Sequence, residues 1–361
     1  MTLQSLPVSL LANGIKITGW KTVRITRGIE RIPSDFEVSM TDNLTGVDQI
    51  IVGTGDPFVL KIGNFTVMTG YIDRVVESMT PSEHALTISG RGKCQDLVDC
   101  SAIFDTFQFL DVFASDIAKK LAKPFSIEVA LEAKEEVMFS QVCLNVGETP
   151  FAVIDRYCKI SNLLCYENED GKLVIGQVSE DMPSSGFKQG VNVQQASYLR
   201  DASNQFSEYR VYPVGNAILT DVGQLPFSEF TYKNELVKRT RVKSFIQMNN
   251  DPGAETSNRH AVWECNRRIG RGNVIALTTD SWVDSNGQLY KPNTQVSVSL
   301  PKLKVQENQK WVIAEVTYRL GMDGTNCDLV LMPPEAFKPE PIIYLILPND
   351  VDAALKVAKG V

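Results

Sequence analysis

Two histidines, His84 and His260, are the only side chains of the chain whose ordinary pKa suits general-base catalysis near neutral pH. A hydrolytic triad needs such a base held between a nucleophile and a carboxylate. His84 follows Ser82 and Glu83 in a turn-like stretch, His260 follows Arg259 in a helix-like stretch, and no GxSxG nucleophile motif occurs. We therefore expect both histidines to be ordinary surface residues and the chain not to be an enzyme.

Metal-binding patterns are equally sparse. The sequence contains no CxxC pair, no HExxH and no EF-hand loop, so we expect no metal and no cofactor. Glu167, Glu169 and Asp170 form an acidic group beside Gly171, which we interpret as a solvated hairpin tip rather than a calcium site. A glycosidase would need two carboxylates across a cleft, and 43 acidic residues supply candidates without discriminating among them.

Basic residues are densest between Val237 and Phe245, at Lys238, Arg239, Arg241 and Lys243. One interpretation is an edge strand that its charges protect from aggregation. The other is a contact with an acidic neighbouring subunit or partner protein. Nucleic-acid binding is disfavoured because no aromatic residues interleave the run and the net charge is −7.

The C-terminal stretch is the second candidate contact. A stiff Lys338-Pro339-Glu340-Pro341 linker precedes a strand-length apolar run. The run consists of Ile342, Ile343, Tyr344, Leu345, Ile346 and Leu347. Such a run should pair with a sheet edge, either on its own chain or on a partner.

At 361 residues, 43% apolar and 22% charged, the chain has the composition of a globular protein with about two to four domains. The longest apolar run is far shorter than the ~20 residues of a membrane helix, and the N-terminus lacks a signal-peptide pattern, so we expect no membrane insertion. Seven cysteines without metal spacing predict a protein assembled in a reducing cytoplasm.

Short alternating runs with Gly, Asn and Pro between them predict a mainly β protein with α+β insertions and two similar antiparallel barrels. Helices are expected at 109–122, at 150–160 after the cap Thr149, and at 253–271. The expected domains are a first barrel (1–95), an α+β domain (96–183), a linker with strands (184–250), a helix with a second barrel (251–335), and an extension (336–361).

Two parts of the chain share one rhythm of strands. Phe36–Met40, Val59–Ile62, Tyr71–Val76 and Leu86–Ser89 have spacings similar to those of a second set. That set consists of Val274–Thr278, Val296–Leu300, Trp311–Tyr318 and Leu329–Leu331. The similarity predicts a duplicated barrel.

Three short motifs surround the hairpin expected at 71–89. They are Gly70-Tyr71-Ile72-Asp73, Ser89-Gly90-Arg91-Gly92, and Asp96 to Ser101, and Gly147-Glu148-Thr149 follows later. In this order and spacing they resemble the baseplate hub proteins of Mu-like contractile-tailed phages, a family related to late-control D proteins and VgrG-type spikes. The resemblance extends from about Val8 to Phe337.

That resemblance implies a structural protein of the virion tail. It implies a homotrimer whose six similar barrels adapt the six-fold tail tube to a three-fold central spike, beside baseplate wedge proteins, with a channel through which DNA passes without specific binding. The alternatives are a cell-wall hydrolase and a carbohydrate-binding multi-barrel protein. A row of exposed Trp or Tyr would favour the latter.

Overall fold

The structure is a computed structural model of the 361-residue chain. It describes the residues 6–41, 52–81, 84–134, 136, 138–160, 163–214, 230–248, 254–305 and 309–337.

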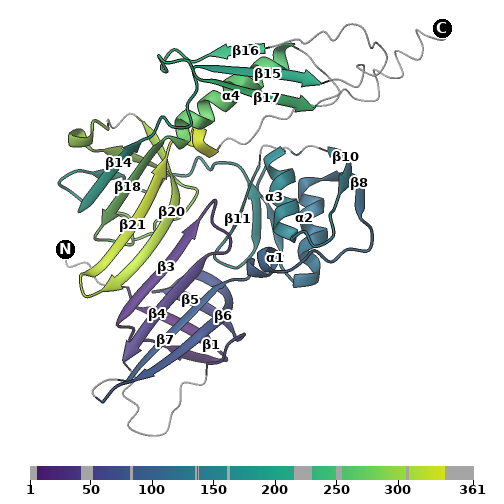
Figure 1. Cartoon of the computed structure of the whole chain (residues 1–361). Helices are drawn as coiled ribbons and strands as arrows, with labels where there is room; N and C mark the ends of the chain where they lie inside the picture. Colours follow the sequence, from purple (N-terminus) through teal and green to yellow (C-terminus); the bar gives the residue numbers. More distant parts are fainter. Residues whose placement is uncertain are drawn as a thin grey trace, which may run out of the picture.

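The first part of the chain forms one half of a large sheet, drawn in purple and blue in Figure 1. Its strands pair antiparallel in the order β3-β4-β7-β6-β5-β1-β2. They are β1 (Val8–Ala12), β2 (Ile15–Ile17), β3 (Thr22–Gly28), β4 (Asp35–Thr41), β5 (Pro57–Ile62), β6 (Phe65–Met79) and β7 (His84–Gly92). Alternating burial along these strands follows the apolar and polar alternation of the sequence.

The last part of the chain forms the other half of the sheet. Its strands pair in the order β14-β18-β21-β20-β19-β13, and only the short β13–β19 pair is parallel. They are β13 (Phe187–Lys188), β14 (Gln195–Arg200), β18 (Asn273–Thr279), β19 (Gln295–Ser299), β20 (Lys310–Gly321) and β21 (Gly324–Met332). Short 3-10 turns, η3 (Pro301–Leu303) and η4 (Pro334–Phe337), follow β19 and β21.

The two halves repeat one pairing scheme. The neighbours β3-β4-β7-β6-β5 of the first half match β14-β18-β21-β20-β19 of the second, and the matching strands follow one another in the same chain order. Even the irregularities match: the pairing of β6 with β7 slips between Ile72 and Arg74, and that of β20 with β21 slips between Ile313 and Glu315. The rhythm of strands in the sequence therefore corresponds to a repeated strand order.

The halves are not two separate closed barrels. β3 pairs antiparallel with β20, so that both halves belong to one sheet of 13 strands whose hydrogen-bonded order has two ends among the described strands. No described set of strands closes into a ring, so that the two similar barrels expected from the sequence are not confirmed. Periodicity predicts strands and their faces, but it does not specify which edges meet.

One apolar core runs under both halves. It contains Phe36 and Phe58, whose rings meet edge to face with centroids 4.6 Å apart, and Trp311, which is fully buried in the second half. Truncating such aromatic residues to alanine typically costs about 3–5 kcal/mol.

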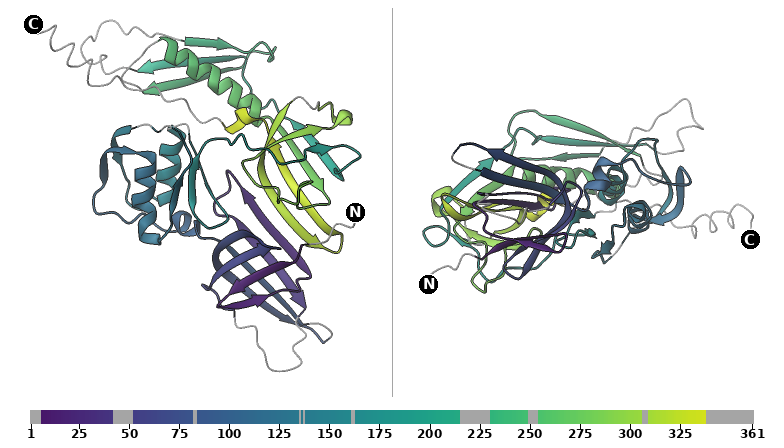
Figure 2. Two further views of the ribbon diagram at one scale, coloured as in Figure 1. Left: turned by 180° about the vertical axis from the view of Figure 1, so that it is seen from behind. Right: turned by 90° about the horizontal axis from the view of Figure 1, so that it is seen from below.

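An α+β domain follows β7 and packs beside the sheet, as both views in Figure 2 show. It contains α1 (Gln95–Asp99), β8 (Gln108–Phe113), α2 (Ala114–Ala122), η1 (Lys123–Phe125), β9 (Val129–Leu131), β10 (Met138–Cys143), α3 (Pro150–Ile160), β11 (Leu164–Glu167) and β12 (Leu173–Gly176). The predicted cap of α3 is confirmed, because the Ala152 N–H donates to Thr149 Oγ1 at 3.2 Å. The predicted helix at 109–122 begins only at Ala114, because the preceding residues form β8 and pair with β10.

A further unit is inserted between β14 and β18, at the top of Figure 1. It consists of β15 (Glu208–Val214), β16 (Phe230–Lys233), β17 (Val242–Met248) and α4 (Ala254–Arg271). Tyr209 and Val211 of β15 and Ala261 and Cys265 of α4 form its buried core. α4 also contacts η4, where a Cβ on Gly270 would lie 2.6 Å from the Ala336 nitrogen, so this helix position requires glycine.

Candidate interaction surfaces

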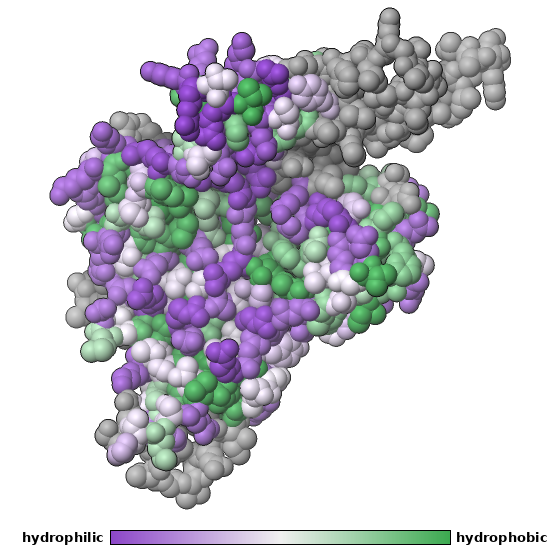
Figure 3. Space-filling model, in the orientation of Figure 1, coloured by the Kyte–Doolittle hydropathy of each residue, from purple (hydrophilic) through white to green (hydrophobic). Residues whose placement is uncertain are grey.

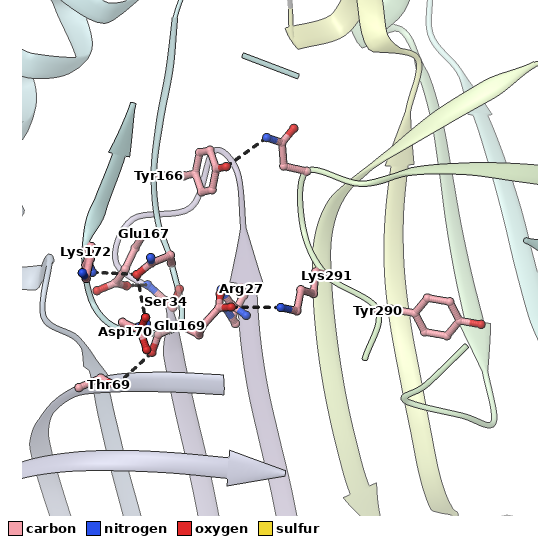
Figure 4. A network of polar contacts seen from close by, with 12 residues as sticks. Arg27, Ser34, Thr69, Tyr166, Glu167, Glu169, Asp170, Lys172, Tyr290 and Lys291 are labelled. Carbon is pink, nitrogen blue, oxygen red and sulfur yellow. Dashed lines mark hydrogen bonds and ion pairs between the residues drawn. The ribbon is translucent and has the colours of Figure 1, made fainter. Parts of the chain in front are cut away.

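A buried carboxylate joins the α+β domain to the sheet. Glu167, at the end of β11, is 3% exposed, and its two carboxylate oxygens accept the backbone N–H groups of Ser34 (3.0 Å) and Cys94 (2.9 Å). Burial raises the pKa of Glu167 above its ordinary value, although the two N–H donors and Arg27 act in the opposite direction. The acid thus fixes three distant segments to one another, as Figure 4 shows for Glu167 and Ser34.

The glycines of the hairpin motifs make room for this contact. A Cβ on Gly92 would lie 2.0 Å from Glu167 Oε2, and a Cβ on Gly70, its partner across β6 and β7, would lie 1.9 Å from the Arg91 carbonyl oxygen. Both distances are far below van der Waals contact. The two glycines are therefore needed for close packing of β6, β7 and β11.

A second acid of the same hairpin bridges both halves of the sheet. Glu169 pairs with Arg27 of β3 (3.0 Å) and with Lys291, which precedes β19 (3.1 Å) (Figure 4). Burial alone would raise the pKa of Glu169, but Arg27 and Lys291 outweigh it and lower the pKa to about 2. Nearby, Asn293 Nδ2 donates to the Tyr166 hydroxyl at 3.1 Å.

These contacts correct the interpretation of Glu167 and Glu169 as a solvated hairpin tip. The Asp170-Gly171 turn is present between β11 and β12, as predicted, and Asp170 is exposed, but Glu167 and Glu169 contact the sheet. The one local signal was the position of Glu167 at the end of an otherwise apolar strand. Its partners lie 73 and 133 residues away in the chain and leave no local pattern.

The outward face of the sheet carries many polar and charged side chains. Where β14, β18, β21 and β20 lie side by side, it forms a shallow hollow with both polar and apolar lining residues. They are Gln195, Ser197, Thr278, Glu315, Thr317 and Asp328, together with Ala276, Leu277, Leu329 and Val330. Thr26 and Thr317 continue the face across the joint of the halves, with their hydroxyl oxygens 3.1 Å apart. In the face seen in Figure 3, hydrophobic residues form small areas separated by hydrophilic ones.

Four arginines of this face form ion pairs with carboxylates. Arg24 pairs with Asp35 (2.5 Å), Arg319 with Asp328 (2.9 Å), Arg91 with Asp73 (2.7 Å), and Arg31 with Glu315 (3.4 Å). Each pair contributes little stability at such exposed positions. Their effect is a surface of small polar groups and nearly balanced charge.

The four residues of the basic run do not form one surface. The expected strand begins only at Val242, so that Lys238 and Arg239 lie exposed in the preceding turn. Arg241 is held against a neighbouring loop: its guanidinium donates to the carbonyls of Ala202 (3.4 Å) and Ser203 (2.6 Å) and lies over the Phe206 ring. Lys243 Nζ lies 6.0 Å from the same ring.

β17 is an edge strand of its three-stranded sheet, as one interpretation of the basic run requires. The other sequence candidate, Ile342 to Leu347, lies outside the described residues.

The histidines, cysteines and tryptophans singled out in the sequence lie at ordinary positions of the fold. His84 is the first residue of β7, and all seven cysteines are free. Among the described residues, no group of three or more His, Cys, Asp or Glu could hold a metal ion. Trp20, Trp282 and Trp311 are buried and cannot form an exposed aromatic row. In the same part of the chain, no helix is both long and apolar enough to cross a membrane.

An internally repeated sheet joined to packed side domains defines the class, a mainly β multidomain protein. Comparison with known proteins identifies the family. Residues 7–92 match the model of the N-terminal domain of Mu phage baseplate assembly protein GpP-like proteins, residues 94–177 match the second domain of gp44-like baseplate hub proteins, and residues 253–340 match the fourth domain of GpP.

Whole-chain comparisons agree. Baseplate hub protein gp44 of Escherichia phage Mu is 26% identical over 338 residues, which are 91% of this chain and 88% of that protein. The 43 kDa tail protein of prophage MuSo2 from Shewanella oneidensis superposes with a TM-score of 0.81 at 26% identity, over 93% of this chain and all of the other. A tail protein from Neisseria meningitidis MC58 shares the fold, with a TM-score of 0.80 at 20% identity, over 94% of this chain and 100% of that one.

The chain belongs to the baseplate hub proteins of Mu-like phages. It is a structural component of the virion tail, and the expectation based on the hairpin motifs is confirmed.

Proposed function

We propose that three copies of the chain form a closed ring that joins the six-fold tail tube to the three-fold central spike. The observation that carries the proposal is the internal duplication: each chain contributes two sheet halves with the same strand order and matching bulges. Three chains then present six similar halves to a six-fold partner, while the side domains repeat only three times. Contacts between unlike surfaces that close under rotation produce such a ring.

The polar face of the sheet supports a channel through which DNA passes without specific binding. Specific or tight DNA binding requires clustered Lys and Arg facing the phosphates. Several arginines of this face are paired with carboxylates instead, as Arg24 is with Asp35 and Arg319 with Asp328. A wall of this kind offers the DNA backbone few unpaired cations.

The ring also needs contacts with the spike, the tube and the wedge proteins of the baseplate. Lys238 and Arg239 remain candidates for an acidic partner, because both are exposed and Arg241 and Lys243 are engaged with Phe206. The apolar run from Ile342 to Leu347 is the second candidate, as a strand added to a partner sheet.

The molar mass in solution tests the proposal. Light scattering over a range of protein concentrations and salt should give about three times the chain mass of 40.0 kDa. A monomer or a dimer that persists at high concentration, both alone and with the cognate spike, would contradict a ring of three.

A further inference from the structure

The α+β domain contains a ribbon of two antiparallel strands, β8 and β10, that has one face on the domain core. On this inner face Val112 and Val142 are buried against α2 and α3, and Phe109 and Phe139 pack beside them. Among the described strands, none pairs with the other edge of β8 or of β10. An antiparallel sheet in this position normally presents polar side chains on its other face.

The outer face of the ribbon carries three large apolar side chains instead. Leu110 is 59% exposed, Met138 56% and Phe113 38%, and Met138 lies directly opposite Phe113. Asp111 has a φ of 49°, and this break in the alternation of β8 turns Leu110 outward although Val112 faces the core. Exposed apolar groups on a ribbon of only two strands indicate a surface that another element covers.

The described chain ends beside the same domain. Phe337 of η4 is 1% exposed and belongs to a buried cluster with Leu164 of β11. Figure 1 shows α2 and α3 between β11 on one side and β8 and β10 on the other, and α2 contacts both β8 and β9. One helix layer is about 10–12 Å thick, whereas the ten residues from Phe337 to Leu347 extend over as much as about 33–36 Å. The segment after η4 is therefore long enough to reach the ribbon.

The sequence of that segment is typical of a strand followed by an amphipathic helix. The run from Ile342 to Leu347 is apolar at every position and ends at Pro348. Asp350 is then a suitable N-cap and Gly360 a suitable C-terminal end of a helix. Between them, apolar residues recur with the spacing of one helix face, at Val351, Ala354, Leu355 and Ala358.

We propose that this C-terminal segment completes the α+β domain of its own chain. Ile342 to Leu347 adds a third strand to the β8–β10 ribbon, and the helix expected at 351–359 covers the outer apolar face. The ribbon becomes a middle layer, with α2 and α3 on one side and the C-terminal helix on the other. The inference goes beyond the proposed ring and does not depend on it.

The chemistry of the two surfaces is complementary. A strand that lies between two helix layers needs apolar side chains on both faces, as the run from Ile342 to Leu347 has them. Asp105 and Asp111 are exposed on the ribbon and the loop before it, and Lys356 and Lys359 lie in the last turn of the expected helix. If the run paired with a sheet of a partner protein instead, this chain would leave the outer face of its ribbon uncovered.

Cross-linking to a native thiol of the full-length protein tests the placement. Cys143 of β10 is exposed, whereas the other cysteines are buried or half-buried. In the variant Ala354→Cys, a short bis-maleimide should join the new thiol to Cys143 within one chain. The product should keep the mass of one chain on a denaturing gel, and mass spectrometry of its peptides identifies the link. Met322→Cys is the matched control without such a link, because Met322 is 100% exposed in the β20–β21 turn.

A substitution on the ribbon provides a second readout. Leu110→Lys, added to Ala354→Cys, should lower the yield of the link about tenfold, because burial of one leucine changes an equilibrium constant by roughly that factor or more. Leu236→Lys should leave the yield unchanged, because Leu236 is 75% exposed in the turn between β16 and β17. Circular dichroism verifies that each variant is folded.

Each outcome decides the inference. A link to Cys143 that is absent in Ale-free wild-type chains, specific to Ala354→Cys and sensitive to Leu110→Lys supports it. No link, or the same yield as with Met322→Cys, would overturn it. A product with the mass of two chains would place the segment on a neighbouring copy and overturn the docking within one chain. The molar mass of the same samples tests the ring separately, so that the two proposals fail independently.

Discussion

Replacing Glu169 with glutamine tests the junction between the α+β domain and the sheet. The pKa of Glu169 falls from 4.5 to about 2 in the folded protein. At about 1.4 kcal/mol per pKa unit this corresponds to about 3 kcal/mol. Because the Glu169 side chain is 29% exposed and therefore partly screened, we expect a loss of about 2 kcal/mol at pH 7.

The pH dependence of this stability loss shows whether its origin is electrostatic. A carboxyl group whose pKa is lowered on folding stabilises the protein above its unfolded pKa, and this contribution disappears as the pH falls through the folded value. The difference in unfolding free energy between wild type and Glu169→Gln should therefore be full at pH 7 and shrink steadily between pH 4.5 and pH 2.

Urea denaturation followed by circular dichroism at several pH values measures this difference. Glu37→Gln is the matched control, because Glu37 is an exposed glutamate of β4, and it should change stability by less than about 0.5 kcal/mol. A loss for Glu169→Gln that is equal at pH 3 and pH 7, or no larger than that of the control, would refute the electrostatic origin of the junction.

Three further predictions concern packing, capping and the basic run. Gly92→Ala should destabilise the protein by about 1–3 kcal/mol in urea denaturation, because its Cβ would collide with Glu167, whereas Gly321→Ala, with nothing within 4 Å, should be nearly neutral. Equal effects of the two substitutions would contradict the close approach of Gly92 to Glu167. Thr149→Ala should lower the stability by about 1 kcal/mol, because α3 loses its cap, whereas Thr149→Ser should retain most of the capping effect. Thermal unfolding measures both variants. An alanine variant as stable as the wild type would show that the cap does not stabilise the protein. Arg241→Ala should lower the melting temperature, because it removes contacts with Ala202, Ser203 and Phe206. Lys238→Ala should leave the melting temperature unchanged, because Lys238 is exposed. A larger decrease for Lys238→Ala than for Arg241→Ala would contradict this assignment.

Local patterns in the sequence identified most strands, because burial in this sheet alternates with period two. They also located α3 and the Asp170-Gly171 hairpin, whose signals are contained within a few residues. The helix expected from Phe109 failed because Leu110 and Phe113, which supply its apolar spacing, are 59% and 38% exposed in a strand. Spacing alone does not distinguish an apolar face that is buried from one that is not.

Neither the junction of the α+β domain with the sheet nor the joint between the sheet halves could be predicted, because the residues that form them are far apart in the sequence. Thr26 and Thr317, which span the joint of the halves, are 291 residues apart, and Glu167 finds its donors at Ser34 and Cys94. Similarly, the duplication was visible as a rhythm of strands, but the continuous sheet depends on the edge pairing of β3 with β20. The domain limits drawn from composition remain predictions.

The arrangement of copies in the assembled particle tests the central claim most directly. Electron microscopy of the purified protein, viewed along the ring axis, should show a closed ring of three chains with six similar lobes around a central opening. Class averages with only three lobes, or open chains of copies without closure, would contradict a hub built from duplicated sheet halves.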